Sequence, residues 1–318
     1  MNRAIALLLL AVAAINACAE GWPAKPVRAI VPVGAGSSTD IVHRIVLEQL
    51  SEQFAQPFVV ENRVGAGGVI GSGVVAKSPA DGYTLLANGS AHTIVPALYK
   101  NLSYDPVRDF IPVAAVGSSS SVLVVTAESG FKTAADLVAA AKARPGALTF
   151  SSVGIGTATH LSAERFLASA GVQATHIPFT GGAEAMTEVL AGRVSFFFGP
   201  IALVQPQVRA GKLVALALNG SRRSAAMPEV PTLAEAGIRD AEYPIWFGLF
   251  VPVGTPRDVV ERLNKETLKA LQAPKVRDKL AGLGVDAMAM SPEEFGAHVD
   301  REFAVNAGLA RAAGLKAE

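Results

Sequence analysis

Four short segments rich in glycine, serine and threonine could bind a small anion. Each follows an apolar run: GAGSSTD (34–40), NGSAH (88–92), SSVGIGTATH (151–160) and FTGGAEA (179–185). Glycine lets the backbone approach a ligand closely, hydroxyl groups hydrogen-bond it, and the first turn of a helix presents free N–H groups with partial positive charge. These properties suit a carboxylate. In the first segment, helix capping by Ser38 or Thr39 is the alternative interpretation.

Other chemistries find little support in the sequence. GAGGVIGSG (65–73) comes close to a dinucleotide-binding fingerprint, but Ile70 stands where the third glycine is required. There is no P-loop and no G-x-S-x-G nucleophile motif. None of the histidines has the H-x-x-x-H spacing of metal ligands; they are His43, His92, His160, His176 and His298. We therefore expect no cofactor and no metal. An exported enzyme stays an alternative, with His160 as its one evident base.

Composition excludes several classes of protein. The chain has 318 residues, 50% of them hydrophobic and 17% charged, with a formal net charge of +1 and a single cysteine. So much apolar content excludes intrinsic disorder, and one cysteine excludes a disulfide scaffold. A neutral chain with only 6% aromatic residues has no electrostatic or stacking surface for nucleic acid. The length predicts two domains.

The first residues have the pattern of a secretory signal. Arg3 precedes the apolar run AIALLLLAVAAI (4–15), and Ala17-Cys18-Ala19 fits an A-x-A cleavage site. We expect residues 1–19 to be a signal peptide cleaved after Ala19, with lipidation at Cys18 as the alternative. Export to the periplasm also argues against ATP and NAD as cofactors. No later run is long enough to span a bilayer.

The candidate loops need strands and helices to hold them in place. Apolar runs and helical periodicity alternate along the chain, as in a parallel sheet with ligand loops at the carboxyl ends of its strands. The first series predicts strands at 27–33, 57–62 and 83–87 with helices at 40–56 and 69–77. The second predicts strands at 147–154, 174–179, 194–199 and 213–221 with helices at 133–146, 156–171 and 181–193.

A second crossing then returns the chain to the first series. The extended apolar stretch PIWFGLFVP (244–252) precedes predicted helices at 256–272, 275–282 and 292–313. The implied architecture has two α/β lobes, each a doubly wound sheet, joined by two crossover segments with a cleft between them. Trp246 and Phe247 could form an apolar wall of that cleft, although core packing is the stronger interpretation.

Several long motifs resemble the Bug or TctC family, the extracytoplasmic solute-binding receptors of tripartite tricarboxylate transporters. The motifs are WPAKPVRAIVPVGAGSSTDIVHR (22–44), VVENRVGAGGVIGSGVVAKSPADGYTLL (59–86), YDPVRDFIPVAAVG (104–117), SSVGIGTATHLSAERF (151–166), AGKLVALALNGSRRSAAMPEVPTLAEAG (210–237) and WFGLFVPVGTPRDVVERLN (246–264). They occur in order and cover nearly the whole mature chain.

The resemblance implies a two-lobed periplasmic-binding-protein fold of type II-like topology. Lobe 1 would comprise residues 20–122 and 247–318, and lobe 2 residues 123–246. The lobes would close on a small organic carboxylate, which a membrane permease would then receive. The family's ligand contacts fall here on Val33, Gly34, Ala35, Ser37, Ser38, Thr39, Asn88, Gly89, Ser152, Gly154, Thr157, His160, Thr180 and Gly181.

Two departures from the family pattern bear on the ligand. Ser37 or Ser38 stands where the first loop commonly has a further glycine, which adds hydroxyl groups. Gly199-Pro200 replaces a frequent acidic or amide residue, which disfavours a ligand carrying an amino group. We expect a periplasmic, monomeric binding protein that leaves its ligand chemically unchanged. A sensor that presents the ligand to a receptor kinase is the alternative.

Overall fold

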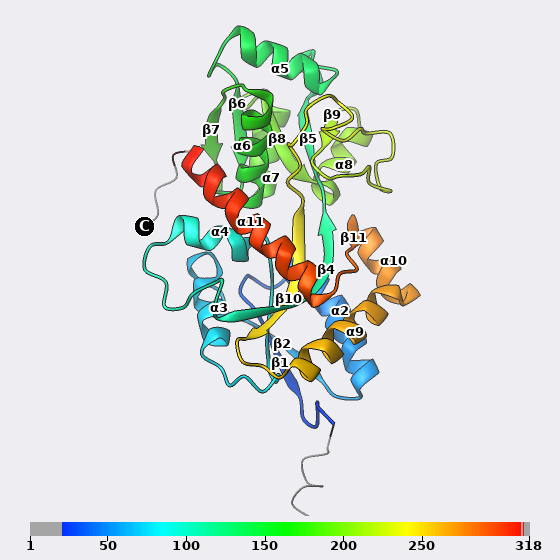
Figure 1. Cartoon of the computed structure of the whole chain (residues 1–318). Coiled ribbons are helices and arrows are strands. Elements are labelled where there is room, and N and C mark those ends of the chain that lie inside the picture. Colours follow the sequence, from blue (N-terminus) through cyan, green and yellow to red (C-terminus); the bar gives the residue numbers. More distant parts are fainter. Residues whose placement is uncertain (1–20, 313, 315–318) are drawn as a thin grey trace, which may run out of the picture.

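A computed structural model describes residues 21–312 and residue 314, so the predicted signal peptide lies outside the described residues. The chain forms two α/β lobes, each built around one sheet (Figure 1). The larger sheet has the strand order β11-β4-β10-β3-β1-β2, and the smaller one has the order β7-β6-β8-β5-β9. This confirms the two-lobed periplasmic-binding-protein fold.

The first lobe contains the chain's N-terminal and C-terminal parts. Its strands are β1 (Val27–Val31), β2 (Phe58–Asn62), β3 (Thr84–Gly89), β4 (Phe110–Ser119), β10 (Ile245–Pro252) and β11 (Val285–Ala287). Its helices are α2 (Ser38–Phe54), α3 (Val69–Ala76), α4 (Ala91–Leu98), α9 (Arg257–Gln272), α10 (Pro274–Gly282) and α11 (Pro292–Ala312). The core on one face of the sheet packs against α2 and α9 through Leu50, Leu263 and their neighbours.

The second lobe is formed by the middle of the chain. Its strands are β5 (Ser121–Thr126), β6 (Thr149–Ser152), β7 (Thr175–Pro178), β8 (Phe196–Pro200) and β9 (Leu213–Leu218). Its helices are α5 (Ala134–Ala143), α6 (Ala158–Ala170), α7 (Gly182–Leu190) and α8 (Ile201–Arg209). Phe150, Phe196 and Phe198 fill the core beneath α6, while Phe197 points to the opposite face against α7 and α8. The alternation follows from the two-residue period of a strand.

Both sheets are mixed, whereas the sequence pattern predicted parallel ones. β1 pairs in parallel with β2 and β3, but β10 is antiparallel to both β3 and β4. In the second lobe β5 is antiparallel to β8 and β9. The reversed strands are β5 and β10, which each begin directly after a crossing, and β11, which pairs antiparallel with β4. A chain that enters a lobe from the cleft side runs against the strands that end there.

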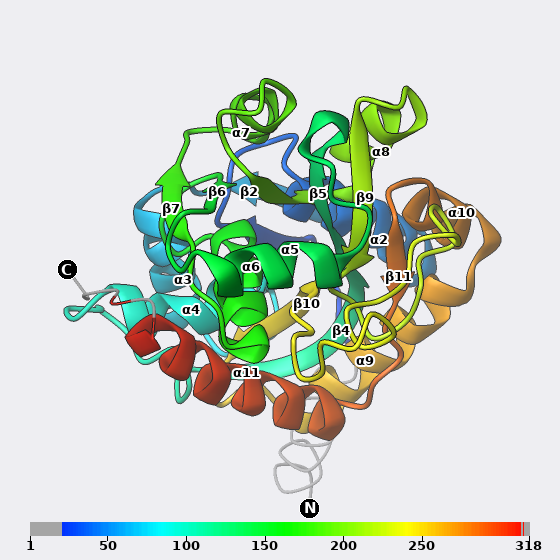
Figure 2. The ribbon, with the colours of Figure 1, turned by 90° about the horizontal axis from the view of Figure 1, so that it is seen from above.

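The two crossings lie side by side between the lobes. Only Ser120 separates β4 from β5, and the return crossing enters the first sheet at Ile245 (Figure 1). Helix α11 contacts α6 of the second lobe as well as α4 of the first, and it lies along one edge of the molecule in the view from above (Figure 2). Asn306 on α11 accepts a hydrogen bond from the Tyr243 hydroxyl at 2.6 Å and donates one to Thr93 at 2.8 Å.

His92 on α4 makes the stability of the first lobe depend on pH. Its buried ring packs against Phe110, Phe250 and Phe303, with ring centroids 5.1, 4.6 and 5.7 Å away. Nε2 donates to the Pro106 carbonyl at 2.9 Å, and Nδ1 has no partner among the described residues. Burial lowers the pKa of His92 to about 4, and the hydrogen bond to Pro106 offsets only part of this effect.

We expect His92 to lower the free energy of unfolding as the pH falls from about 6.5 to about 4, because only the unfolded chain binds a proton there. Relative to a His92→Gln variant, the wild type should lose about 3 kcal/mol between pH 7 and pH 4, at ~1.4 kcal/mol per pKa unit. The comparison with the variant is needed because burial raises the pKa of the Glu302 carboxyl, which acts in the opposite direction. Urea unfolding of both proteins across this range tests the expectation, and equal pH slopes would contradict it.

Candidate functional site

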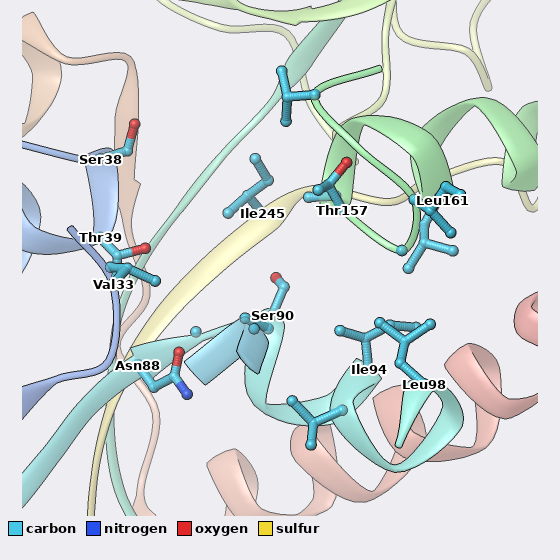
Figure 3. Close-up of a pocket in the computed structure, with 18 of the residues that line it drawn as sticks. Val33, Ser38, Thr39, Asn88, Ser90, Ile94, Leu98, Thr157, Leu161 and Ile245 are labelled. Atoms are coloured by element: carbon cyan, nitrogen blue, oxygen red, sulfur yellow. The ribbon is translucent and has the colours of Figure 1, made fainter. Parts of the chain in front are cut away.

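A cavity of about 410 Å³ lies between the lobes (Figure 3). The β1–α2 loop, the end of β3 and helix α4 line it from the first lobe, and the β6–α6 loop faces them from the second. The return crossing forms its back wall through Tyr243, Ile245 and Phe247. None of the described residues that line the cavity is Asp, Glu, Lys, Arg or His. Any charged ligand group must therefore be held by backbone groups, hydroxyls and amides.

The first loop presents the N-terminus of α2 to the cavity. The Ser37 hydroxyl caps the helix by accepting a hydrogen bond from the Asp40 N–H at 3.3 Å, so Ser37 has the capping role that the sequence suggested for Ser38 or Thr39. Ser38 and Thr39 instead line the cavity, together with Val33. The N–H groups of the first helical turn have no intrahelical partner and carry partial positive charge, which suits a carboxylate.

Asp40 stabilises the conformation of the first loop. Its carboxylate accepts hydrogen bonds from the Gly36 N–H at 2.9 Å, the Asn62 amide at 2.8 Å and Arg44 Nε at 3.0 Å. Burial alone would raise the pKa of Asp40, but these hydrogen bonds and the charge of Arg44 keep it below its usual value. The Asn62 amide also donates to the Val33 carbonyl at 3.0 Å, which fixes the start of the loop.

The second loop presents the N-terminus of α6 from the other lobe. Thr157 occupies the N-cap position but makes no side-chain cap; its hydroxyl donates to the Gly154 carbonyl at 2.7 Å. The loop turns through positive φ at Gly154 (+129°) and Gly156 (+74°), which favours glycine at both positions. The backbone N–H groups of Val153, Gly154 and Gly156 donate to side chains of their own lobe. Ile155, which lines the cavity, and the first turn of α6 are therefore the parts of this loop left to meet a ligand.

His160 does not line the cavity, in contrast to the expectation that it contacts the ligand. Its ring is buried behind the loop, stacked on His176 with ring centroids 3.9 Å apart, and Nδ1 accepts the Gly156 N–H at 3.0 Å. His176 in turn stacks on Phe150 and forms a hydrogen bond of 2.7 Å with the Ser152 hydroxyl. Burial first, and then the neighbouring His160, lower the pKa of His176 to about 4. His176 is therefore uncharged at neutral pH, and the stacked pair supports the loop from its inner side.

Replacing His160 should separate loop support from ligand contact. A His160→Leu variant leaves the Gly156 N–H without an acceptor, so we expect about tenfold weaker binding of a carboxylate ligand. A His160→Gln variant keeps an acceptor that can reach back to the loop and should bind within about threefold of the wild type. Calorimetric titration of the three proteins distinguishes them. If both variants bind equally weakly, the hydrogen bond to Gly156 does not support the loop.

Asn88 is the most informative polar residue of the cavity. Its Oδ1 is buried and has no hydrogen-bond partner among the described residues, although the side chain lines the cavity (Figure 3). Leaving a buried amide oxygen unpaired costs about 1–3 kcal/mol, and because this oxygen is an acceptor it suits a hydrogen-bond donor on the ligand, such as a hydroxyl, and not a carboxylate oxygen. Asn88 and Gly89 belong to β3, which extends two residues beyond the predicted strand because β10 pairs with both of them.

The structure brings only some of the predicted ligand contacts to this cavity. The residues that line it are Val33, Ser38, Thr39, Asn88, Gly89 and Thr157. The others lie beside or behind its wall: Gly34, Ala35, Ser37, Ser152, Gly154, His160, Thr180 and Gly181. Ser152 is buried against His176, and the exposed Thr180 hydrogen-bonds Glu184 in its own lobe. The side chains of Ser152 and Thr180 are thus engaged within their own lobe.

Sequence reasoning missed the apolar half of the site. Ile94, Val95 and Leu98 on α4 line the cavity, but the segment containing Pro96 was not recognised as a helix. The spacing of Ile94 and Leu98, four residues apart, was the available signal. Phe247 lines the cavity and also packs in the core, whereas Trp246 is buried in the core alone.

A second, smaller cavity of about 200 Å³ shares Ser38, Ile245 and Phe247 with the first. Pro200 lines it at the position where the family pattern often has an acidic or amide residue. Within residues 21–312, no cluster of three or more His, Cys, Asp or Glu side chains could hold a metal ion. None of the helices described there is long and apolar enough to cross a membrane.

The comparison with known families agrees with this geometry. A family model described as "Tripartite tricarboxylate transporter family receptor" matches residues 42–315. The chain belongs to this family. Among relatives, the protein BugT of Bordetella pertussis is 35% identical over 322 residues, covering 99% of this chain and 99% of BugT. The resemblance to the Bug or TctC receptors is thus confirmed, and with it a solute-binding role in periplasmic transport.

Solved structures of similar receptors carry carboxylates. MatC from Rhodopseudomonas palustris, solved with bound malate, is 29% identical with a TM-score of 0.74, over 91% of this chain and 100% of that one. Another R. palustris protein, solved with adipate, is 32% identical with a TM-score of 0.78, over 93% of this chain and 100% of that one.

Proposed function

We propose that this receptor captures a small organic carboxylate between its lobes and delivers it, chemically unchanged, to the membrane subunits of a tripartite tricarboxylate-type transporter. The observation that carries the proposal is the arrangement of two helix N-termini on opposite sides of one cavity. Malate and adipate in the two similar structures support a carboxylate ligand. An oriented set of N–H groups needs no charged side chain to bind an anion.

Binding and lobe closure follow from the same contacts. The carboxylate oxygens would accept hydrogen bonds from first-turn N–H groups of α2 and α6 and from the hydroxyls of Ser38 and Thr39. Because these donors belong to different lobes, a ligand held by both favours the closed arrangement over the open one. The units that move would be residues 20–122 with 247–318, and residues 123–246. A closed surface shared by both lobes is what a permease could recognise.

Cleavage after Ala19 would release a monomeric receptor into the periplasm, where its membrane partners are reached by diffusion. No chemical step is proposed: His160, the one base that the sequence suggested for an enzyme, is buried behind the loop, where its Nδ1 accepts the Gly156 N–H.

Calorimetric titration of the mature chain, residues 20–318, tests the proposed function. We expect saturable binding of at least one acid from a panel of adipate, malate and hexanoate, and no binding of hexanol, which lacks the carboxylate. An acid at 100 times its Kd should add about 2.7 kcal/mol to the free energy of unfolding. NMR spectra of the recovered acid should be unchanged. Conversion of the acid would indicate an enzyme, and absence of binding to ligand-free, folded protein would refute carboxylate capture.

A further inference from the structure

The cavity is divided into a polar end and an apolar end. Ser38, Thr39 and Asn88 lie on one side in Figure 3, next to the first loop and β3. Ile94, Leu98 and Leu161 lie on the other side, where α4 of the first lobe faces α6 of the second (Figure 3). The unpaired oxygen of Asn88 belongs to the polar end. Thr157, at the start of α6, borders this side as well, so the apolar end proper is the part lined by Ile94, Leu98 and Leu161 (Figure 3).

The apolar end is a continuation of a hydrophobic cluster. Ile94, Leu161 and Tyr243 are 6%, 1% and 3% exposed and pack with Leu309 of α11, and the half-buried Leu98 packs against the same cluster. The Tyr243 hydroxyl donates its hydrogen bond to Asn306, so that proton does not serve a ligand. These side chains present carbon to the cavity, and apolar groups gain free energy by leaving water for such a surface.

A charged group would be poorly accommodated at that end. Burying a carboxylate without a hydrogen-bonding or ionic partner is strongly unfavourable. At that end the side chains of Ile94, Leu98 and Leu161 offer a second carboxylate neither a cation nor a hydrogen-bond donor. The lining thus discriminates between acids of equal length according to the polarity of their far end.

We propose that the site selects a monocarboxylate with an apolar body, whose carboxylate lies at the loops and whose carbon chain or ring lies between α4 and α6. This inference rests on the proposed function and names its substrate class. Leu98 would be a specificity-determining residue, since it lines the apolar end from α4 and approaches Gly156 across the cleft.

Titration with two acids of the same carbon number tests the proposal. Hexanoate and adipate both have six carbons and differ in the second carboxylate; we expect hexanoate to bind at least tenfold more tightly than adipate. A Leu98→Gln variant should bind hexanoate about tenfold more weakly while its affinity for acetate stays within about twofold. The control variant Val253→Gln alters an exposed valine, which the structure places outside the cavity lining, and should match the wild type.

Different outcomes of these titrations contradict the monocarboxylate inference and the proposed function. Adipate binding as tightly as hexanoate, or more tightly, would overturn the inference while leaving carboxylate capture intact. Equal hexanoate affinities for the wild type and the Leu98→Gln variant would also overturn it, because the carbon chain would then lie elsewhere. If no acid binds, both the proposed function and the monocarboxylate inference are refuted.

Discussion

Replacing Gly156 with valine should weaken carboxylate binding by at least about 100-fold while leaving both lobes folded. Gly156 has a φ of +74°, and a Cβ at this position would lie 2.4 Å from Leu98 Cδ1 on the opposite lobe. The variant therefore pushes the second loop away from α4 and strains the backbone whose N–H is held by His160. Both effects disturb the approach of the two helix N-termini. Calorimetric titration with the best-binding acid of the panel measures the loss.

Two further proteins identify the cause of that loss. Gly146 has nearly the same φ of +75°, but a Cβ added there would meet no atom within 4 Å, so Gly146→Val reports backbone strain alone and should bind normally. Adding Leu98→Ala to Gly156→Val removes the side chain in the way and should bring affinity within about tenfold of Leu98→Ala alone. If Gly156→Val binds like the wild type, the loop of the second lobe does not take part in the site.

Replacing Asn219 with alanine should lower the free energy of unfolding by about 3–5 kcal/mol. Asn219 is fully buried next to the two crossings: its Oδ1 accepts the Ser121 N–H at 2.7 Å, and its amide donates to the Tyr243 carbonyl at 2.6 Å. A further hydrogen bond of 2.9 Å joins it to Ser162 on α6. Truncation leaves several buried polar groups without partners, and each costs about 1–3 kcal/mol.

Urea unfolding measures this effect, and Asn101 provides the matched control. Asn101 is exposed just after α4, so Asn101→Ala should change the free energy of unfolding by less than about 0.5 kcal/mol. A loss below about 1 kcal/mol for Asn219→Ala would show that the crossings are held together by other contacts.

The repeating strand-loop-helix pattern was sufficient to predict the two lobes and loops that line the cavity between them. Apolar runs of buried strands such as β1, and the periodic helices α9 and α11, fall within two residues of the expected boundaries. Glycine and hydroxyl residues between a strand and a helix indicated the first loop, although they also serve helix capping, as Ser37 does here. Thr39 and Thr157 indeed face one cavity from opposite lobes.

The sequence pattern does not predict features that depend on tertiary contacts. The short β11 forms only by pairing with β4, and α4 contains a proline that conceals its helical period. The antiparallel direction of β10 depends on where the chain re-enters the sheet, which periodicity does not encode. His160 was assigned to the ligand because its helix begins at the site, but its ring turns back to accept the Gly156 N–H. Side-chain direction at a helix start depends on the partners nearby, here His176.

Hydrogen exchange of the backbone amides, with and without a saturating acid, tests most directly whether one ligand is held by both loops. We predict slower exchange over residues 33–40 and 154–161 together, with residues 134–143 of α5 unchanged as an internal reference. Both loops should become protected over the same range of acid concentration, because a single molecule contacts donors from each lobe. Protection of one loop alone, or of neither, would contradict capture of a carboxylate between the two helix N-termini.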